Sequence, residues 1–117
     1  MQIVDNQSEI KLQAEIFQWA WNTHPATRRL LFHVPNGGKR SKIEAMQLKA
    51  SGVVAGVPDL LFIWKGRLYA FELKTLTGSV SDAQAVVHLT WNEHNVKVQI
   101  VRTLDSFQYL FNQILIN

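Results

Sequence analysis

The stretch GVPDLLFIWKGRLYAFELKT, residues 56–75, decides the fold that the sequence predicts. It holds two apolar runs separated by the pair Lys65-Gly66, which suits the two-residue turn of an antiparallel hairpin. The first run, residues 60–64, is apolar on both faces of a strand, as expected of a strand buried in the centre of a sheet. We therefore predict an α/β protein with this hairpin at its centre.

Charged residues occupy the open end of the hairpin, far from its turn. Counting outward from Lys65-Gly66 places Asp59 directly opposite Glu72, with Cβ atoms about 4.5–5.5 Å apart, and puts Lys74 on the same face. Two carboxylates this close repel each other unless a cation neutralises them. Oxygen ligands from Asp and Glu favour a hard divalent ion, so the pattern predicts Mg²⁺ or Mn²⁺ rather than zinc.

A simpler interpretation is open for the same residues. Asp59 can be a turn residue after Pro58, and Glu72 with Lys74 can form an exposed edge pair worth about 0–1 kcal/mol. The apolar run beside them favours the metal site, because charges at the ends of a buried strand are not freely solvated.

The whole chain limits the kind of protein that this can be. Its 117 residues, 47% of them apolar, fit one domain spanning residues 1–117. The absence of cysteine excludes disulfides and thiolate metal sites. The sequence shows neither a signal-peptide pattern nor an apolar run of membrane length, so we expect a cytoplasmic protein without membrane contact. The net charge of +3 weakly favours a polyanionic partner.

Helices and two further strands are predicted around the hairpin. Ser8 is the expected N-cap of the first helix, and the spacings Ser41 to Glu44 and Ser81 to Gln84 are typical of capping boxes. The predicted order is a helix at 8–22, a strand at 30–34, a helix from 41 to before 52, the hairpin, a helix at 81–94, a strand at 96–102 and a helix at 105–115. This order is α-β-α-β-β-α-β-α.

The first predicted helix carries two glutamates. Glu9 and Gln13 project from its apolar stripe, whereas Glu15 lies with polar residues, so Glu9 is the inward one. A buried carboxylate needs a partner. The alternative is that Glu9 is a first-turn glutamate favoured by the helix dipole. The stripe consists of Ile16, Phe17, Ala20 and Trp21.

The motifs resemble a known group of proteins. Pro58-Asp59, twelve further residues and then Glu72-Leu73-Lys74 are similar to the signature of the PD-(D/E)xK nucleases. The segments SEIKLQ, HVPNGGKR, LKASGVVAGVPDLL, FELKT and SDAQ together resemble the VRR-NUC family of small nucleases over most of the chain. The resemblance implies a restriction-endonuclease-like mixed sheet core with flanking helices, in a single VRR-NUC-like nuclease domain.

The resemblance also implies roles for individual residues. It implies a phosphodiester hydrolase whose Mg²⁺ or Mn²⁺ is bound by Asp59, Glu72 and the backbone carbonyl of Leu73, with Glu9 as a further ligand. Lys74 would orient or deprotonate the attacking water. Gln84 would support Lys74 or that water, in addition to capping its helix. His88, one turn further along, is expected to pack or to contact phosphate rather than to bind metal.

A glycine-containing loop follows the first predicted strand. Its amides and cations would grip a phosphate backbone, as the resemblance implies, although NGGKR read alone is a solvated turn. The predicted DNA-binding residues are His33, Asn36, Gly37, Gly38, Lys39 and Arg40.

The expected substrate is DNA, because the family is associated with replication and repair. Stand-alone members of this length resemble Holliday-junction resolvases and act as homodimers, so branched DNA, replication or repair partners and a nucleoid-associated or viral setting are implied. One rival is a catalytically inactive DNA-binding module on a nuclease fold, which would bind in a salt-sensitive way without cutting. Another is a structural or assembly protein, which would do neither.

Overall fold

The predicted hairpin forms the centre of the sheet. The structure, a computed structural model, describes residues 6–35 and 41–117. Strand β2 (Leu60–Trp64) pairs antiparallel with β3 (Arg67–Leu73), and the last pair before the turn is Trp64 with Arg67, as predicted. Lys65 and Gly66 have φ of 49° and 79°, so both turn residues are left-handed, as a two-residue hairpin turn requires.

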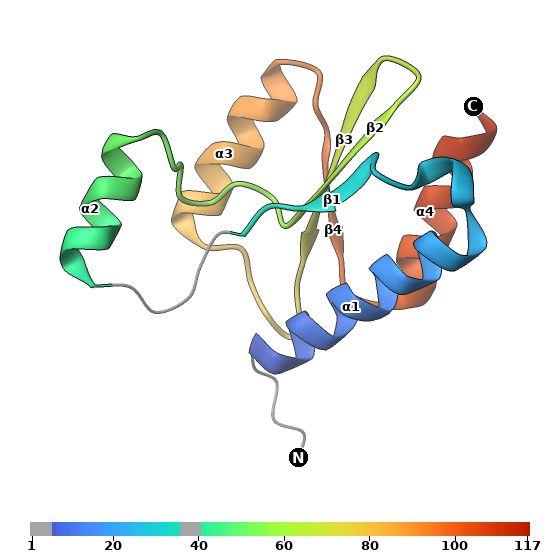
Figure 1. The fold of residues 1–117 in the computed structure, drawn as a ribbon, viewed down its shortest axis with the longest axis horizontal. Helices are drawn as coiled ribbons and strands as arrows, with labels where there is room; N and C mark the ends of the chain where they lie inside the picture. Colours follow the sequence, from blue (N-terminus) through green and yellow to red (C-terminus); the bar gives the residue numbers. More distant parts are fainter. Residues whose placement is uncertain (1–5, 36–40) are drawn as a thin grey trace.

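The hairpin belongs to a mixed sheet with the order β1-β2-β3-β4. Strand β1 (Leu31–His33) runs antiparallel to β2, while β4 (Val98–Val101) runs parallel to β3. A parallel pair needs a crossover connection, and helix α3 (Asp82–Glu93) supplies it (Figure 1). The open end of the hairpin therefore lies beside the first turn of α3.

The remaining helices are α1 (Asn6–Thr23), α2 (Lys42–Ala50) and α4 (Leu104–Ile116). The order of helices and strands agrees with the prediction, apart from an added 3-10 turn, η1 (Pro25–Thr27). The cap at Ser81 is confirmed as a complete capping box, and the Ser41 hydroxyl accepts from the amide of Glu44. The predicted cap at Ser8 is wrong, because α1 already begins at Asn6.

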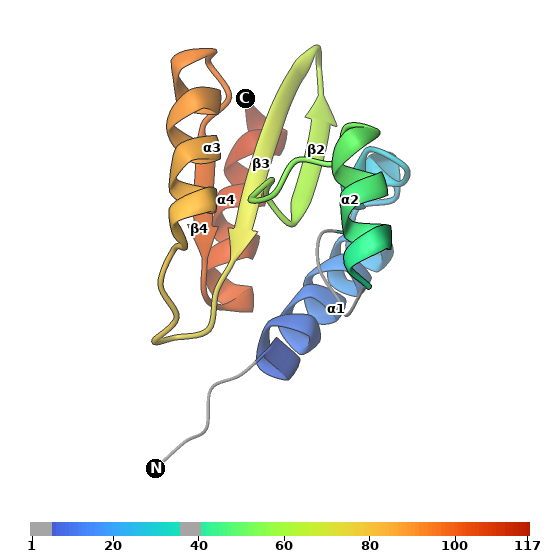
Figure 2. The same ribbon diagram turned by 90° about the vertical axis from the view of Figure 1, so that its left-hand side faces the viewer.

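The core lies between the sheet and the helices α1 and α4. Figures 1 and 2 show α3 on the other side of the strands from α4. The predicted apolar stripe of α1 is only half buried: Ile16 and Ala20 are inside, while Phe17 and Trp21 are each 36% exposed. The buried cluster comprises Ile16, Ala20, Leu31, Leu60, Phe62, Phe71, Leu73, Val101, Phe107 and Phe111.

No helix in the described part of the chain is both long and apolar enough to span a bilayer.

Candidate functional site

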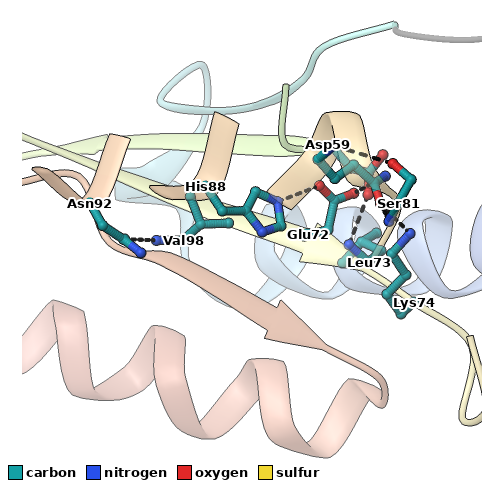
Figure 3. A network of polar contacts seen from close by, with 9 residues as sticks. Asp59, Glu72, Leu73, Lys74, Ser81, His88, Asn92 and Val98 are labelled. Carbon is teal, nitrogen blue, oxygen red and sulfur yellow. Dashed lines mark hydrogen bonds and ion pairs between the residues drawn. The ribbon is translucent and has the colours of Figure 1, made fainter. Parts of the chain in front are cut away.

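The charged residues at the open end of the hairpin are brought together and removed from water. Asp59 directly precedes β2, and its Oδ2 accepts a hydrogen bond of 2.8 Å from the backbone amide of Leu73 (Figure 3). Glu72 is 1% exposed and Lys74 is 7% exposed. The simpler interpretation of Glu72 and Lys74 as an exposed edge pair is therefore wrong.

The two carboxylates interact directly. The pKa of Glu72 is raised to about 9, chiefly by burial and then by the hydrogen bond and the negative charge of Asp59, while the charge of Lys74 lowers it. At neutral pH, Glu72 therefore keeps a proton as long as no cation replaces that proton. Such a pair is poised to exchange a proton for a metal ion.

Gln84, from the first turn of α3, connects the site to the helix cap. Its Oε1 accepts from Lys74 Nζ at 2.6 Å and from the backbone amide of Ser81 at 2.9 Å. Its Nε2 donates to Glu72 Oε2 at 3.3 Å. The capping role and the contact with Lys74 thus coexist in one side chain.

His88 lies one turn further along α3. Its Nε2 is 2.9 Å from Glu72 Oε1, and its side chain is 13% exposed. Burial lowers the pKa of His88, as does the charge of Lys74, while Asp59 raises it. The neutral ring is therefore favoured, and its Nε2 lies within hydrogen-bond distance of the Glu72 carboxyl group.

Sequence reasoning assigned His88 to packing or phosphate contact, whereas the structure places it on Glu72. The signal was its spacing of four residues from Gln84, which puts both side chains on one helix face.

Helix α1 contributes Glu9. This residue is half-buried, and it accepts a hydrogen bond from the backbone of Thr75. Burial raises the pKa of Glu9; Asp59 also raises it, whereas Lys74 and the Thr75 amide lower it. These interactions place Glu9 beside the hairpin carboxylates. Glu15 is exposed, so the predicted orientation of the two glutamates is confirmed.

His33 ties β1 to the same site. Its Nδ1 lies 2.9 Å from the backbone oxygen of Asp59, which also accepts from the amide of Val34 at 3.0 Å. Because a carbonyl only accepts, Nδ1 is the donor in this contact. The other predicted DNA-binding residues, Asn36, Gly37, Gly38, Lys39 and Arg40, lie outside the described residues.

The donor set fits a hard divalent cation. Asp59, Glu72 and the Leu73 carbonyl offer only oxygen, and the charge of Lys74 offsets only part of the effects that keep Glu72 protonated. Among residues 6–35 and 41–117, no three His, Asp or Glu side chains form a ready-made metal centre. An ion here would be held by the two carboxylates, the carbonyl and water, and Mg²⁺ usually keeps several waters.

Comparison with known proteins finds similar solved structures but no similar sequence. The sequence matches no protein-family model and no curated protein. A solved structure titled VRR_NUC domain protein aligns with a TM-score of 0.70 at 19% identity, covering 90% of this chain and 85% of that one. A second, titled VRR_NUC domain, gives 0.57 at 18% identity and covers 90% and 95%. The resemblance predicted from the motifs is thus confirmed at the level of the fold, and the chain has the restriction-endonuclease-like α/β fold of the VRR-NUC domain proteins.

Proposed function

We propose that this protein is a metal-dependent endonuclease that hydrolyses DNA phosphodiester bonds. The observation that carries the proposal is the buried Glu72, paired with the half-buried Asp59 and with Lys74 beside it, at the open end of the central hairpin. Carboxylates and a lysine gathered in one buried cluster, on a fold shared with VRR_NUC domain proteins, fit phosphoryl chemistry better than a purely structural role.

A bound Mg²⁺ or Mn²⁺ would stabilise negative charge on the scissile phosphate and lower the pKa of a water molecule. Asp59, Glu72 and the Leu73 carbonyl would hold that ion, and Glu9 would reach it from α1. The protein groups that surround it keep the carboxylates in place, because Leu73 N holds Asp59, while Gln84 and His88 each hold one oxygen of Glu72.

Lys74 would orient the attacking water and assist its deprotonation. Its Nζ is fixed by the Oε1 of Gln84 at 2.6 Å, so the ammonium is held in one position within a mostly buried site. Assistance of this kind contributes about 10²–10⁴-fold to the rate. Lys74→Ala and Asp59→Ala are therefore expected to give folded proteins with almost no cleavage.

The substrate that we propose is branched DNA such as a four-way junction. The support comes from the resemblance of the motifs to small stand-alone VRR-NUC proteins and from the net charge of +3. A homodimer would place two sites on two strands of such a junction. Delivery by replication or repair proteins, and a place of action in the cytoplasm at the nucleoid or on viral DNA, belong to the same proposal.

The test is cleavage of a labelled four-way junction, with matched flap, duplex and single-stranded DNA, in Mg²⁺ or Mn²⁺. Lys74→Ala is the inactive variant, and Lys11→Ala, an exposed lysine of α1, is the charge-matched control. Paired cuts confined to the junction, lost in Lys74→Ala and kept in Lys11→Ala, are expected. Cuts on flaps or duplex would support a nuclease with a different substrate. Tight binding with no cutting would overturn the proposed activity in favour of a DNA-binding module.

A further inference from the structure

A groove of about 920 Å³ opens at the opposite end of the hairpin from the carboxylates. Its walls are the hairpin turn with the first residues of β3, and the segment that links α3 to β4. Its polar side chains are those of Arg67, Tyr69, Asn92, His94, Asn95 and Lys97.

The chemistry of this groove favours an anionic ligand. Arg67 and Lys97 are exposed cations, and no carboxylate lines the groove, since the neighbouring Glu93 is not part of its wall. The Oδ1 of Asn92 accepts from the amide of Val98 at 3.2 Å, which leaves the side-chain amide of Asn92 as a donor. Cations and amide donors of this kind are typical of contacts to phosphate oxygens.

The groove and the carboxylate cluster lie along the same helix. Figure 3 shows them in a row, with Asn92 at one end, His88 next, and Glu72 with Asp59 at the other. The eight residue steps of α3 from Gln84 to Asn92 span about 12 Å. Along β3, the six residue steps from Leu73 back to Arg67 span about 20 Å.

This separation matches a short run of duplex DNA. At about 3.4 Å per base pair, 12–20 Å corresponds to roughly four to six base pairs. A duplex that runs along the outside of the molecule from a scissile phosphate at Glu72 toward the hairpin turn would bring its backbone to the exposed side chains of Arg67 and Lys97.

We propose that this groove binds the phosphate backbone of the DNA arm about four to six base pairs from the cut. The inference rests on the proposed nuclease function, because it takes the position of the scissile phosphate from the carboxylate cluster. It adds a second DNA-binding site, away from the scissile phosphate, and this site sets the minimum length of the DNA arm that binds with full affinity.

The first experiment measures DNA affinity by fluorescence anisotropy over a range of salt concentrations, on a junction with long arms and with Ca²⁺ replacing Mg²⁺ to prevent cutting. Each phosphate contact contributes about 0.9 to the slope of log affinity against log salt. Arg67→Ala and Lys97→Ala should each reduce the slope by about that amount. Lys11→Ala, which removes an exposed charge on α1, a helix that contributes no residue to the groove, should leave it unchanged.

The second experiment repeats the measurement on junctions whose arms are shortened to about three base pairs and closed by hairpin loops. On these arms the groove variants and the wild type should bind equally, because the DNA ends before it reaches the groove. Equal binding on long arms, or the same loss at every arm length, would overturn the inference.

The two proposals fail in different ways. If the wild type cuts none of the DNAs while the groove variants still lose affinity on long arms, the groove stands as a DNA contact and the nuclease proposal falls. If cleavage is normal and the groove variants bind like the wild type, the nuclease stands and the groove inference falls. A wild type that binds none of these DNAs would overturn both.

Discussion

Glu72 shows how tightly the site is specified at the scale of single residues. Each of its two oxygens already has a protein partner, His88 on Oε1 and Gln84 on Oε2. The same carboxyl group is also hydrogen-bonded to Asp59, so a cation would take the place of the proton between the two acidic residues. His88 and Gln84 come from one face of α3, so the orientation of Glu72 is fixed by that helix as much as by its own strand.

His88 should therefore act as a positioning residue for a metal ion. Removing a partner that orients a ligating group typically lowers metal affinity by about 10–100-fold. We expect this loss in His88→Ala, measured by titration calorimetry with Mn²⁺. His88→Gln should keep most of the affinity, because its amide Nε2 can donate to Glu72.

Thr90→Ala, an exposed change on the same helix, is the control for that experiment. Equal Mn²⁺ affinity in His88→Ala and the wild type would show that the contact with Glu72 does not matter for metal binding.

The raised pKa of Glu72 predicts how the metal-free protein responds to pH. Between the ordinary value of 4.5 and about 9, the folded state keeps a proton that the unfolded state has released. The free energy of unfolding therefore falls as pH rises through this range, by at most about 1.4 kcal/mol per pH unit. His88, whose pKa is lowered by burial, has the opposite effect, but only below its ordinary value of 6.5.

Thermal unfolding of the metal-free protein from about pH 7 to pH 9 isolates Glu72 and should show a Tm that falls by several degrees. Glu72→Gln, which cannot ionise, should remove most of the slope. A variant that keeps the full slope would show that another group is responsible.

At the scale of elements, the loop before β2 is fitted against the first turn of α3. Gly56 has a φ of 90°, and a Cβ added there would lie 2.5 Å from the backbone oxygen of Ala83 and 2.8 Å from the amide nitrogen of Gln84. Gly52 has a φ of 109° but nothing within 4 Å of an added Cβ. Both glycines have a positive φ that a residue with a side chain rarely adopts, but only at Gly56 would an added Cβ meet other atoms.

Gly56→Ala should thus destabilise the protein more than Gly52→Ala. The left-handed conformation alone costs about 1–2 kcal/mol for a residue with a Cβ, and Gly56→Ala adds an overlap with backbone atoms that cannot rotate away. Urea unfolding of both variants measures the difference. Because the overlap involves Gln84, Gly56→Ala should also weaken Mn²⁺ binding, and equal stability of the two variants would contradict the packing seen here.

The features that were predicted correctly from the sequence depend on interactions between residues close together in the chain. The Lys65-Gly66 turn fixes the register of the hairpin, so the approach of Asp59 to Glu72 follows from counting, and the cap at Ser81 needs only its own first turn. The spacing from Gln84 gave the helix face on which His88 lies, but its contact with Glu72 was not predicted, because that contact depends on how α3 packs against β3. The exposure of Phe17 and Trp21 was not predicted, because the spacing of apolar residues shows which side of the helix faces the core but not how many of them the core covers.

At the scale of the whole molecule, one aromatic cluster joins the sheet to α1 and α4. The ring of Phe111 lies 4.6 Å from that of Phe62 and 5.1 Å from that of Phe107, and it is fully buried. Phe111→Ala should lower the free energy of unfolding by about 3–5 kcal/mol, because the transfer term and the cavity add. Leu89→Ala, 63% exposed on α3, should change it by less than about 0.5 kcal/mol.

Urea unfolding followed by both circular dichroism and tryptophan fluorescence measures these changes. A single core predicts coincident transitions by the two probes. Transitions that separate would indicate that the layer formed by α3 unfolds apart from the rest.

Five of the clustered side chains, those of Asp59, Glu72, Lys74, Gln84 and His88, come from one stretch of chain, residues 59–88. Closing short loops loses little chain entropy, and contacts close in sequence form early in folding. The hairpin and α3 can therefore meet and assemble this group before the N-terminal helix arrives. We therefore expect Glu9, which is separated from Asp59 by the longest stretch of chain, to join the group last, so that the site would be completed only when α1 packs.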